Sequence, residues 1–390
     1  MRDNVGRTDL TTRIHIGGAP MNVLFTTAIP SPYQVELFDA LAASGKVDIT
    51  VLYSLLKHSS RSWDLPRLAH NYRVLSEISI EAAHDLMRGH KLVVFSGYDT
   101  RQLRQLIALR AKSGEPWAFW GERPGFLLPS WLGRCYRRAV VPELSSPTTP
   151  IWGIGSWAVD GYRREFGSRR KLLNIPYFSK LDDFLAIDRA DAIAPPRRIL
   201  FSGSLIKRKG VDLLVKAFLA IASEFPKLEL HLIGDGPMRE QLRAISAPVA
   251  GRVRFHGFKQ WAELPTYYAM ADVLCAPSRY DGWGLIIPEG LASGLLVVST
   301  NRTGAALDLV DSDCGWVVQA GALDPLIEAL RTAASTSGPE RAARIARGRS
   351  IAAGQDITAG VERVLAAIQE SHAHGTQEHG DLAPRGLGSA

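Results

Sequence analysis

The sequence predicts an α/β protein made of two doubly wound domains, each built on an open parallel sheet. Short apolar runs alternate with longer amphipathic stretches along most of the chain, which is the rhythm of strand, helix, strand. The runs are apolar throughout, as in parallel sheets that helices cover on both faces. The rhythm stops over residues 187–198 and then restarts, and 390 residues exceed the usual length of one domain.

The first half of the chain supplies four apolar runs that predict strands. They are Asn22–Thr27, Asp48–Tyr53, Lys91–Phe95 and Trp117–Trp120. We assign residues 21–186 to an N-terminal Rossmann-like domain. Residues 1–20 carry scattered charge and a Gly-Gly pair, so we expect a loose extension and regard Met21 as a candidate start. Residues 187–198 combine charge with two adjacent prolines, a composition typical of a linker.

Beyond the linker the rhythm predicts a second Rossmann-like domain over residues 199–371. Its predicted strands are Arg198–Gly203, Leu228–Gly234, Val253–Gly257, Asp272–Pro277 and Leu295–Thr300, and its predicted helices cover 211–224, 237–246, 261–270 and 288–293. The polar residues 372–390 are expected to form a disordered tail. Open parallel sheets bind ligands at the carboxyl ends of their strands, so we expect the site in the cleft between the domains.

Composition narrows the class of protein without choosing a ligand. A formal charge of +7 would suit nucleic acid, an acidic membrane surface or a phosphorylated substrate. Three widely spaced cysteines cannot form a disulfide framework or a zinc quartet. No run approaches the roughly 18–20 apolar residues that span a bilayer, and the N-terminus lacks an apolar signal core. These features predict a cytoplasmic protein.

The stretch Tyr280–Gly294 carries the clearest chemical pattern. Asp281 and Glu289 flank a turn in which Gly282 and Gly284 let the backbone approach a ligand closely. The start of a helix presents unpaired N–H groups to a phosphate, and Glu289, expected to be ionised at neutral pH, can accept hydrogen bonds from ribose hydroxyls. The structural alternative is that Asp281 caps the turn and Glu289 merely suits a first helical turn.

A basic loop within Phe201–Leu214 is the second candidate feature. Lys207, Arg208 and Lys209 follow the carboxyl end of a predicted strand, where a diphosphate could bind. The alternative is a solvated basic loop without a ligand. The spacing of a P-loop is absent.

Four motifs occur in order in the C-terminal half. They are GSLIKRKG over Gly203–Gly210, GDGP over Gly234–Pro237, ADVLCAPS over Ala271–Ser278, and the pair Asp281 and Glu289. Together they resemble the retaining family 4 glycosyltransferases of the GT-B fold. The resemblance implies two Rossmann-like domains facing across a cleft. It also implies transfer of a sugar from a nucleoside-diphosphate sugar to an acceptor hydroxyl, in polysaccharide, glycolipid or glycosylated-metabolite biosynthesis.

The same resemblance implies roles for individual residues. Lys209 would contact the donor diphosphate, Glu289 the ribose, and Asp281 the transferred sugar or its phosphate. The candidates for binding the donor are Gly203, Ser204, Lys209, Gly257, Phe258, Gly282, Trp283, Gly284, Leu285 and Glu289, and the catalytic candidates are Lys209, Asp281 and Glu122. Gly257 and Phe258 would border the nucleobase.

Two positions of the donor motifs depart from the family pattern. Ser204 stands where the family usually has a phosphate-binding Arg. Lys207 or Arg208 could compensate, although a lysine lacks the planar fork of a guanidinium. Asp281 replaces the first Glu of the family's pair, which shortens the side chain and keeps the carboxylate.

The N-terminal half, residues 21–186, matches the family less closely, as expected of a domain that binds the acceptor. Ala28–Phe38 resembles the loop that faces the substrate, with a ligand-free βα turn as the alternative. The His that commonly follows a later strand is absent from Phe119–Gly125, where Glu122 could orient the sugar or pair with Arg123. Residues 126–141 mix apolar and basic side chains and could rest on an anionic membrane that carries a lipid-linked acceptor. An ordinary surface helix is the alternative.

The resemblance implies no metal and no cofactor other than the nucleotide-sugar co-substrate. A sugar-nucleotide epimerase or a glycan phosphorylase of similar build is the first alternative. A dehydrogenase is disfavoured because no G-x-G-x-x-G opens either domain. Only the charge suggests nucleic acid, and no basic and aromatic platform accompanies it. We therefore expect a saccharide, lipid-linked or small-molecule acceptor as partner, and no nucleic acid.

Overall fold

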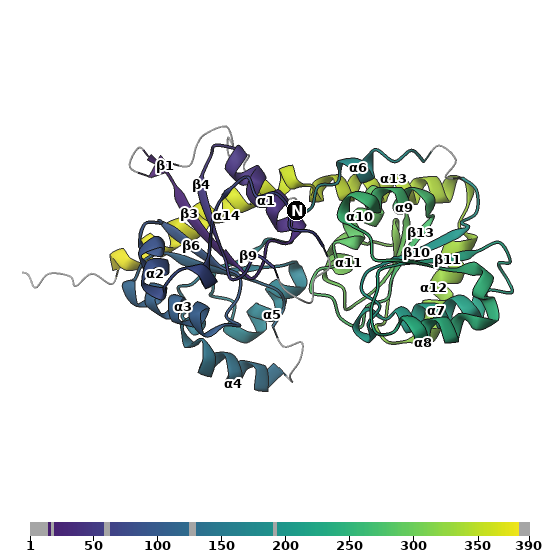
Figure 1. Cartoon of the computed structure of the whole chain (residues 1–390), viewed down its shortest axis with the longest axis horizontal. Coiled ribbons are helices and arrows are strands. Elements are labelled where there is room, and N and C mark those ends of the chain that lie inside the picture. Colours follow the sequence, from purple (N-terminus) through teal and green to yellow (C-terminus); the bar gives the residue numbers. More distant parts are fainter. Residues whose placement is uncertain (1–14, 17–18, 58–62, 125–129, 190–192, 382–390) are drawn as a thin grey trace, which may run out of the picture.

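The computed structural model describes residues 15–16, 19–57, 63–124, 130–189 and 193–381. It contains a seven-stranded and a six-stranded sheet in two lobes that lie side by side along the long axis of the molecule (Figure 1). Every strand pair in both sheets is parallel. The prediction of two parallel α/β sheets is therefore confirmed.

The N-terminal lobe is built on the order β5-β4-β3-β6-β7-β8-β9. Its strands are β3 (Asn22–Thr27), β4 (Asp48–Tyr53), β5 (Asn71–Val74), β6 (Leu92–Phe95), β7 (Trp117–Gly121), β8 (Ile151–Gly153) and β9 (Leu172–Asn174). The sequence predicted β3, β4, β6 and β7. It missed β5 because that edge strand is mostly exposed, and β8 and β9 because runs of three residues carry no readable pattern.

Helices cover both faces of this sheet. They are α1 (Pro32–Ala43), α2 (Ile80–Arg88), α3 (Arg101–Ser113), α4 (Ser130–Val140) and α5 (Ser156–Phe166), with the short turns η1 (Leu75–Glu77) and η2 (Pro142–Ser145). Alternate side chains of β3 point to opposite faces. Val23 and Phe25 join a core with Phe38 of α1, and Leu24 joins a second core with Leu106 of α3.

The C-terminal lobe has the order β12-β11-β10-β13-β14-β15. Its strands are β10 (Arg198–Ser202), β11 (Glu229–Ile233), β12 (Val253–Gly257), β13 (Val273–Ala276), β14 (Leu296–Thr300) and β15 (Gly315–Val318). The five predicted strands are present, and β15 was missed. The chain order reverses between β10 and β13, and such a switch point leaves a crevice at the carboxyl ends of the strands.

The helical elements of this lobe are α6 (Asp182–Leu185), η3 (Lys207–Lys209), α7 (Val211–Ile221), α8 (Arg239–Ser246), η4 (Ala247–Arg252), η5 (Trp261–Glu263), α9 (Leu264–Met270), α10 (Ile286–Ala292), α11 (Gly304–Leu309), α12 (Leu323–Ser335), α13 (Gly338–Ala352) and η6 (Ala353–Gln355). The last helix of the described chain is α14 (Ile357–Asp381). No helix in the described part of the chain is both long enough and apolar enough to cross a membrane.

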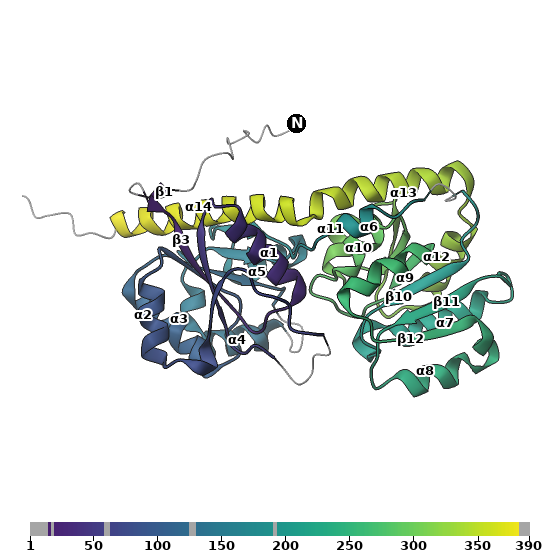
Figure 2. The same ribbon diagram turned by 45° about the horizontal axis from the view of Figure 1, so that its top comes forward.

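The last helix returns to the N-terminal lobe, as Figure 2 shows. It packs against α1 and against β6 and β7. The indole Nε1 of Trp152 donates a buried hydrogen bond of 2.8 Å to Oγ of Ser371, and Lys171 pairs with Glu370 at 2.5 Å. The two lobes are thus joined by a helix as well as by the linker.

This helix corrects two predictions. Residues 357–371 do not complete the C-terminal domain, and residues 372–381 are helical where a disordered tail was expected. The polar composition of 372–381 hid the helix, which is held because Val364, Leu365 and Ile368 are buried on its inner face. Residues 382–390 of the expected tail lie outside the described residues.

The N-terminal extension and the linker also contain structure that composition did not predict. His15–Ile16 (β1) and Ala19–Pro20 (β2) form a short antiparallel pair, while residues 1–14 and 17–18 lie outside the described residues. In the linker, Arg189 donates to the carbonyls of Ser293 at 2.6 Å and Ala271 at 2.9 Å. These bonds fix part of the linker to the C-terminal lobe.

Candidate active site

Two glycine motifs meet at the carboxyl ends of β10 and β11. A Cβ on Gly234 would lie 2.0 Å from the carbonyl oxygen of Gly203, and Gly234 adopts a φ of 119°. Only a glycine allows this close approach with that backbone conformation. The amide of Leu205 donates to the carbonyl of Asp235 at 2.9 Å, which ties the loop after β10 to the turn after β11.

The basic loop is bound to the segment that carries Asp281. Nζ of Lys209 lies 2.5 Å from Oδ2 of Asp281, and both side chains are mostly buried. Nη1 of Arg208 donates to the carbonyl of Tyr280 at 2.9 Å, whereas Lys207 is exposed. Of the three neighbouring basic residues, Lys209 is therefore the one whose side chain pairs with the carboxylate of Asp281.

Glu122 faces this cluster from the opposite lobe. It follows β7, and a Cβ on Gly282 would lie 1.9 Å from its Oε2. Glu122 remains exposed to solvent where it faces Gly282. Desolvation there raises the pKa of Glu122, and the charge of Asp281 raises it further, while Arg208 and Lys209 act in the opposite direction. The structure thus brings Glu122, Lys209, Asp281 and Gly282 together.

Glu289 is buried in the first turn of α10, with 2% of its surface exposed. The hydroxyl of Tyr268 donates to its Oε2 at 2.8 Å. Burial raises the pKa of Glu289 to about 7, with a smaller contribution from Glu36, against the opposing effects of Tyr268 and Lys209. Burial thus opposes the ionisation of this carboxyl group that the sequence led us to expect.

In the turn between Asp281 and α10, the backbone rather than the side chains is available to contact a ligand. Trp283 is buried, and a Cβ on Gly155 would lie 2.7 Å from its ring. Its indole therefore packs against the N-terminal lobe. Gly284 has a φ of 92°, and Leu285 directly precedes α10.

Two cavities flank the cluster. The glycine-loop cavity, of about 500 Å³, is lined by Trp63, Gly203, Ser204, Gly234, Pro237 and Phe258, among others. The tyrosine cavity, of about 560 Å³, is lined by Tyr98, Tyr136, Tyr162, Tyr177 and Tyr280 together with Glu122. Three of the candidates for donor binding, Gly203, Ser204 and Phe258, thus line one cavity, and Gly257 immediately precedes Phe258.

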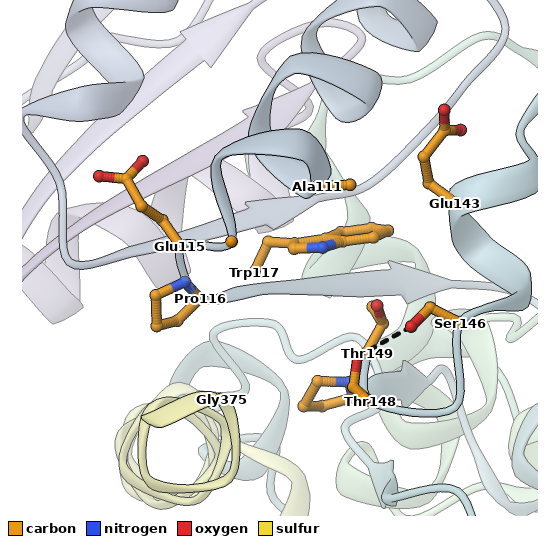
Figure 3. Close-up of a pocket in the computed structure, with 11 residues that line it drawn as sticks. Ala111, Glu115, Pro116, Trp117, Glu143, Ser146, Thr148, Thr149 and Gly375 are labelled. Carbon is orange, nitrogen blue, oxygen red and sulfur yellow. Dashed lines mark hydrogen bonds between the residues drawn. The ribbon is translucent and has the colours of Figure 1, made fainter. Parts of the chain in front are cut away.

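A third cavity, of about 200 Å³, lies away from this cluster (Figure 3). Glu115 and Pro116 line it just before β7 begins, and Gly375 of α14 borders it. It opens at the amino end of the strand, opposite the end where open parallel sheets bind ligands.

Several residues of the site gave no readable signal in the sequence. Tyr268 reaches Glu289 from a neighbouring helix. Arg279 forms a two-pronged pair with Asp212 at 2.7 and 2.8 Å, which anchors the start of α7 beside the site. Arg279 is adjacent to the fourth motif, but only the fold shows its partner. Among the described residues, no group of three or more His, Cys, Asp or Glu is arranged to hold a metal ion.

Comparison with known proteins identifies relatives of part of the chain. Residues 196–336 match the family model described as Glycosyl transferases group 1. A GDP-mannose-dependent alpha-(1-6)-phosphatidylinositol monomannoside mannosyltransferase of Mycobacterium tuberculosis is 27% identical over 209 residues, which are 50% of this chain and 54% of the relative. The lipopolysaccharide core biosynthesis glycosyltransferase LpsE of Rhizobium meliloti is 30% identical over 161 residues, which are 40% of this chain and 46% of that protein. The matched region thus spans about half the length of these curated relatives.

A likeness to solved structures extends over both lobes. The crystal structure of Anabaena Alr3699/HepE in complex with UDP matches with a TM-score of 0.71 at 15% identity, and the match covers 90% of this chain and 100% of that chain. The likeness shows the fold, and the predicted GT-B fold is confirmed.

Proposed function

We propose that this chain is a retaining glycosyltransferase, because residues 196–336 match the family model of the group 1 glycosyl transferases. It transfers a sugar from a nucleoside-diphosphate sugar to an acceptor hydroxyl in glycolipid or polysaccharide biosynthesis. The observation that carries this proposal is the meeting of Glu122 from one lobe with Lys209, Asp281 and Gly282 from the other. A mannosyltransferase and LpsE among the relatives support the reaction class.

The donor occupies the C-terminal lobe. The nucleoside lies in the glycine-loop cavity beside Phe258, and its ribose hydroxyls reach Glu289. The diphosphate lies between Lys209 and the amides of Gly282–Leu285. Lys209 has three N–H donors, so it can bind a phosphate oxygen while keeping its bond to Asp281. The UDP complex of the HepE structure supports a nucleotide donor.

The reaction requires stabilisation of the charge that grows on the departing diphosphate. The bond between the anomeric carbon and the diphosphate oxygen breaks, and the acceptor oxygen bonds to that carbon on the same face. The acceptor proton passes to the departing diphosphate. Lys209 and the preorganised amides stabilise this anion, while Asp281 and Glu122 orient the sugar from both sides. Closure of the lobes excludes water and limits hydrolysis.

The tyrosine cavity is the acceptor site, because Glu122 lies in its wall beside the donor cluster. Tyr136 of α4 also lines it, and the same helix exposes 64% of Trp131 and 37% of Leu132. Exposed apolar side chains beside arginines favour contact with an anionic membrane. We therefore place α4 on the inner face of the membrane, with a lipid-linked acceptor entering from there.

Transfer is tested by supplying UDP- and GDP-sugars with and without saccharide or glycolipid acceptors. Nucleoside diphosphate should appear only when an acceptor is present, which separates transfer from the epimerase and phosphorylase alternatives. A ligand at about 100 times its dissociation constant should also stabilise the protein by about 2.7 kcal/mol in thermal unfolding. If no nucleoside diphosphate or nucleotide sugar shifts the transition, the proposal fails.

Lys209→Ala should abolish transfer while leaving the fold intact, because it removes the cation that faces the diphosphate. Lys207→Ala is the matched control, since that neighbour is exposed. Removing one such electrostatic contact lowers kcat by about 100- to 1000-fold. Wild-type kcat in Lys209→Ala would remove this residue from the mechanism.

A further inference from the structure

The glycine-loop cavity is not built by the C-terminal lobe alone. Trp63, in the segment between β4 and β5 of the N-terminal lobe, lines the same cavity as Gly203, Gly234 and Phe258. The neighbouring Asp64 donates its amide hydrogen to Oε1 of Gln260 at 3.4 Å. An aromatic side chain from the acceptor lobe therefore closes one wall of the donor cavity.

The chemistry of the cavity changes from one end to the other. Gly203 and Gly234 contribute backbone at the end that continues toward the basic loop. Trp63, Phe258 and Leu264 contribute apolar and aromatic surface, and Phe258 exposes 41% of its area. An extended ligand with an anionic end and a flat, apolar-faced end matches this distribution.

Of the parts of a nucleotide sugar, the nucleobase fits the aromatic end. Bases stack on aromatic side chains of any kind because every base presents a π face. Tryptophan supplies the largest such surface at a low cost in conformational entropy, since only two torsions are fixed.

We propose that Trp63 binds the donor nucleobase by stacking on it, so that the N-terminal lobe takes part in donor binding. This inference rests on the proposed function, because it takes the ligand to be a nucleoside-diphosphate sugar. Its consequence is that the nucleobase bridges the lobes. Binding of the nucleoside then favours the arrangement in which Asp64 is tied to Gln260.

The test compares ligands with and without a base on matched variants of the full chain. Binding of UDP and GDP is measured by calorimetry, and inorganic diphosphate is measured by displacement of bound UDP. The variants are Trp63→Ala, Trp63→Phe and Trp131→Ala, the last being an exposed tryptophan of the same lobe on α4.

Trp63→Ala should weaken UDP and GDP binding by about 5- to 150-fold, the range for loss of one base–aromatic stack. Inorganic diphosphate should bind unchanged, Trp63→Phe should retain most of the affinity, and Trp131→Ala should match the wild type. Quenching of indole fluorescence by UDP should be smaller in Trp63→Phe than in the wild type.

Two results would overturn this inference while leaving the proposed function intact. One is wild-type affinity for UDP and GDP in Trp63→Ala. The other is an equal loss for inorganic diphosphate, which would mean that Trp63 shapes the phosphate loop instead of contacting a base. Failure of the wild-type protein to bind any nucleoside diphosphate would overturn the proposed function itself.

Discussion

Glu289→Gln removes a carboxylate that the fold keeps out of water while preserving the acceptor for Tyr268. The wild-type residue is 2% exposed, and its Oε2 accepts a hydrogen bond of 2.8 Å from the Tyr268 hydroxyl. A glutamine of the same length keeps an oxygen for that hydroxyl. We expect the variant to be more stable than the wild type at alkaline pH and impaired in donor binding.

The magnitude follows from the pKa of Glu289, which burial raises from 4.5 to about 7. The folded protein then holds this proton more tightly than the unfolded chain does. The stabilising contribution is fully present below about pH 4.5 and is lost as the pH rises through about 7. At 1.36 kcal/mol per pKa unit, the ionised form costs about 3 kcal/mol of folding free energy at pH 8.5.

The assay is urea unfolding of the wild type, Glu289→Gln and the exposed control Glu77→Gln at pH 5 and pH 8.5. The stability of Glu289→Gln relative to the wild type should rise between these two pH values, by an amount on the order of 2 kcal/mol. In the wild type, the KM for the donor should increase as the pH falls below 7, because protonation removes the charged acceptor. A pH-independent difference, or a variant less stable at pH 8.5, would refute the reasoning.

Two further predictions concern stability away from the cluster. His231 and His256 share a hydrogen bond of 3.0 Å, and burial lowers the pKa of both. Because the unfolded chain binds these protons more readily, stability should fall as the pH drops below about 6.5, and His256→Gln should flatten this slope in urea titrations. Ser371→Ala should destabilise the protein by about 1–3 kcal/mol, since it leaves the buried indole N–H of Trp152 without its acceptor. A change within 0.5 kcal/mol of that in the exposed control Ser335→Ala would contradict this role of Ser371 in anchoring α14.

The sequence was sufficient to predict the fold wherever the strands were long and buried. The mostly buried strands Asn22–Thr27 and Asp48–Tyr53 have the same bounds in the sequence prediction and in the structure. Continuous apolar runs between amphipathic stretches leave few alternatives to a parallel sheet. The helix over 372–381 was not accessible, because its polar composition predicts disorder and only packing on the N-terminal lobe stabilises it.

The candidate site also has some features that the sequence predicts and others that only the structure shows. The motif spacing placed Lys209, Asp281 and Glu289 in one region, because each follows the carboxyl end of a strand in a topology that gathers those ends. The sequence by itself determined the α/β class, the four ordered motifs and the charges available. Only the tertiary structure decided that Lys209 pairs with Asp281, that Glu122 arrives from the other lobe and that Trp63 lines the glycine-loop cavity. The tertiary structure also raised the pKa of Glu289, because it buries this side chain away from water. Contacts between lobes and burial both depend on distances in space, which a linear pattern of residues does not contain.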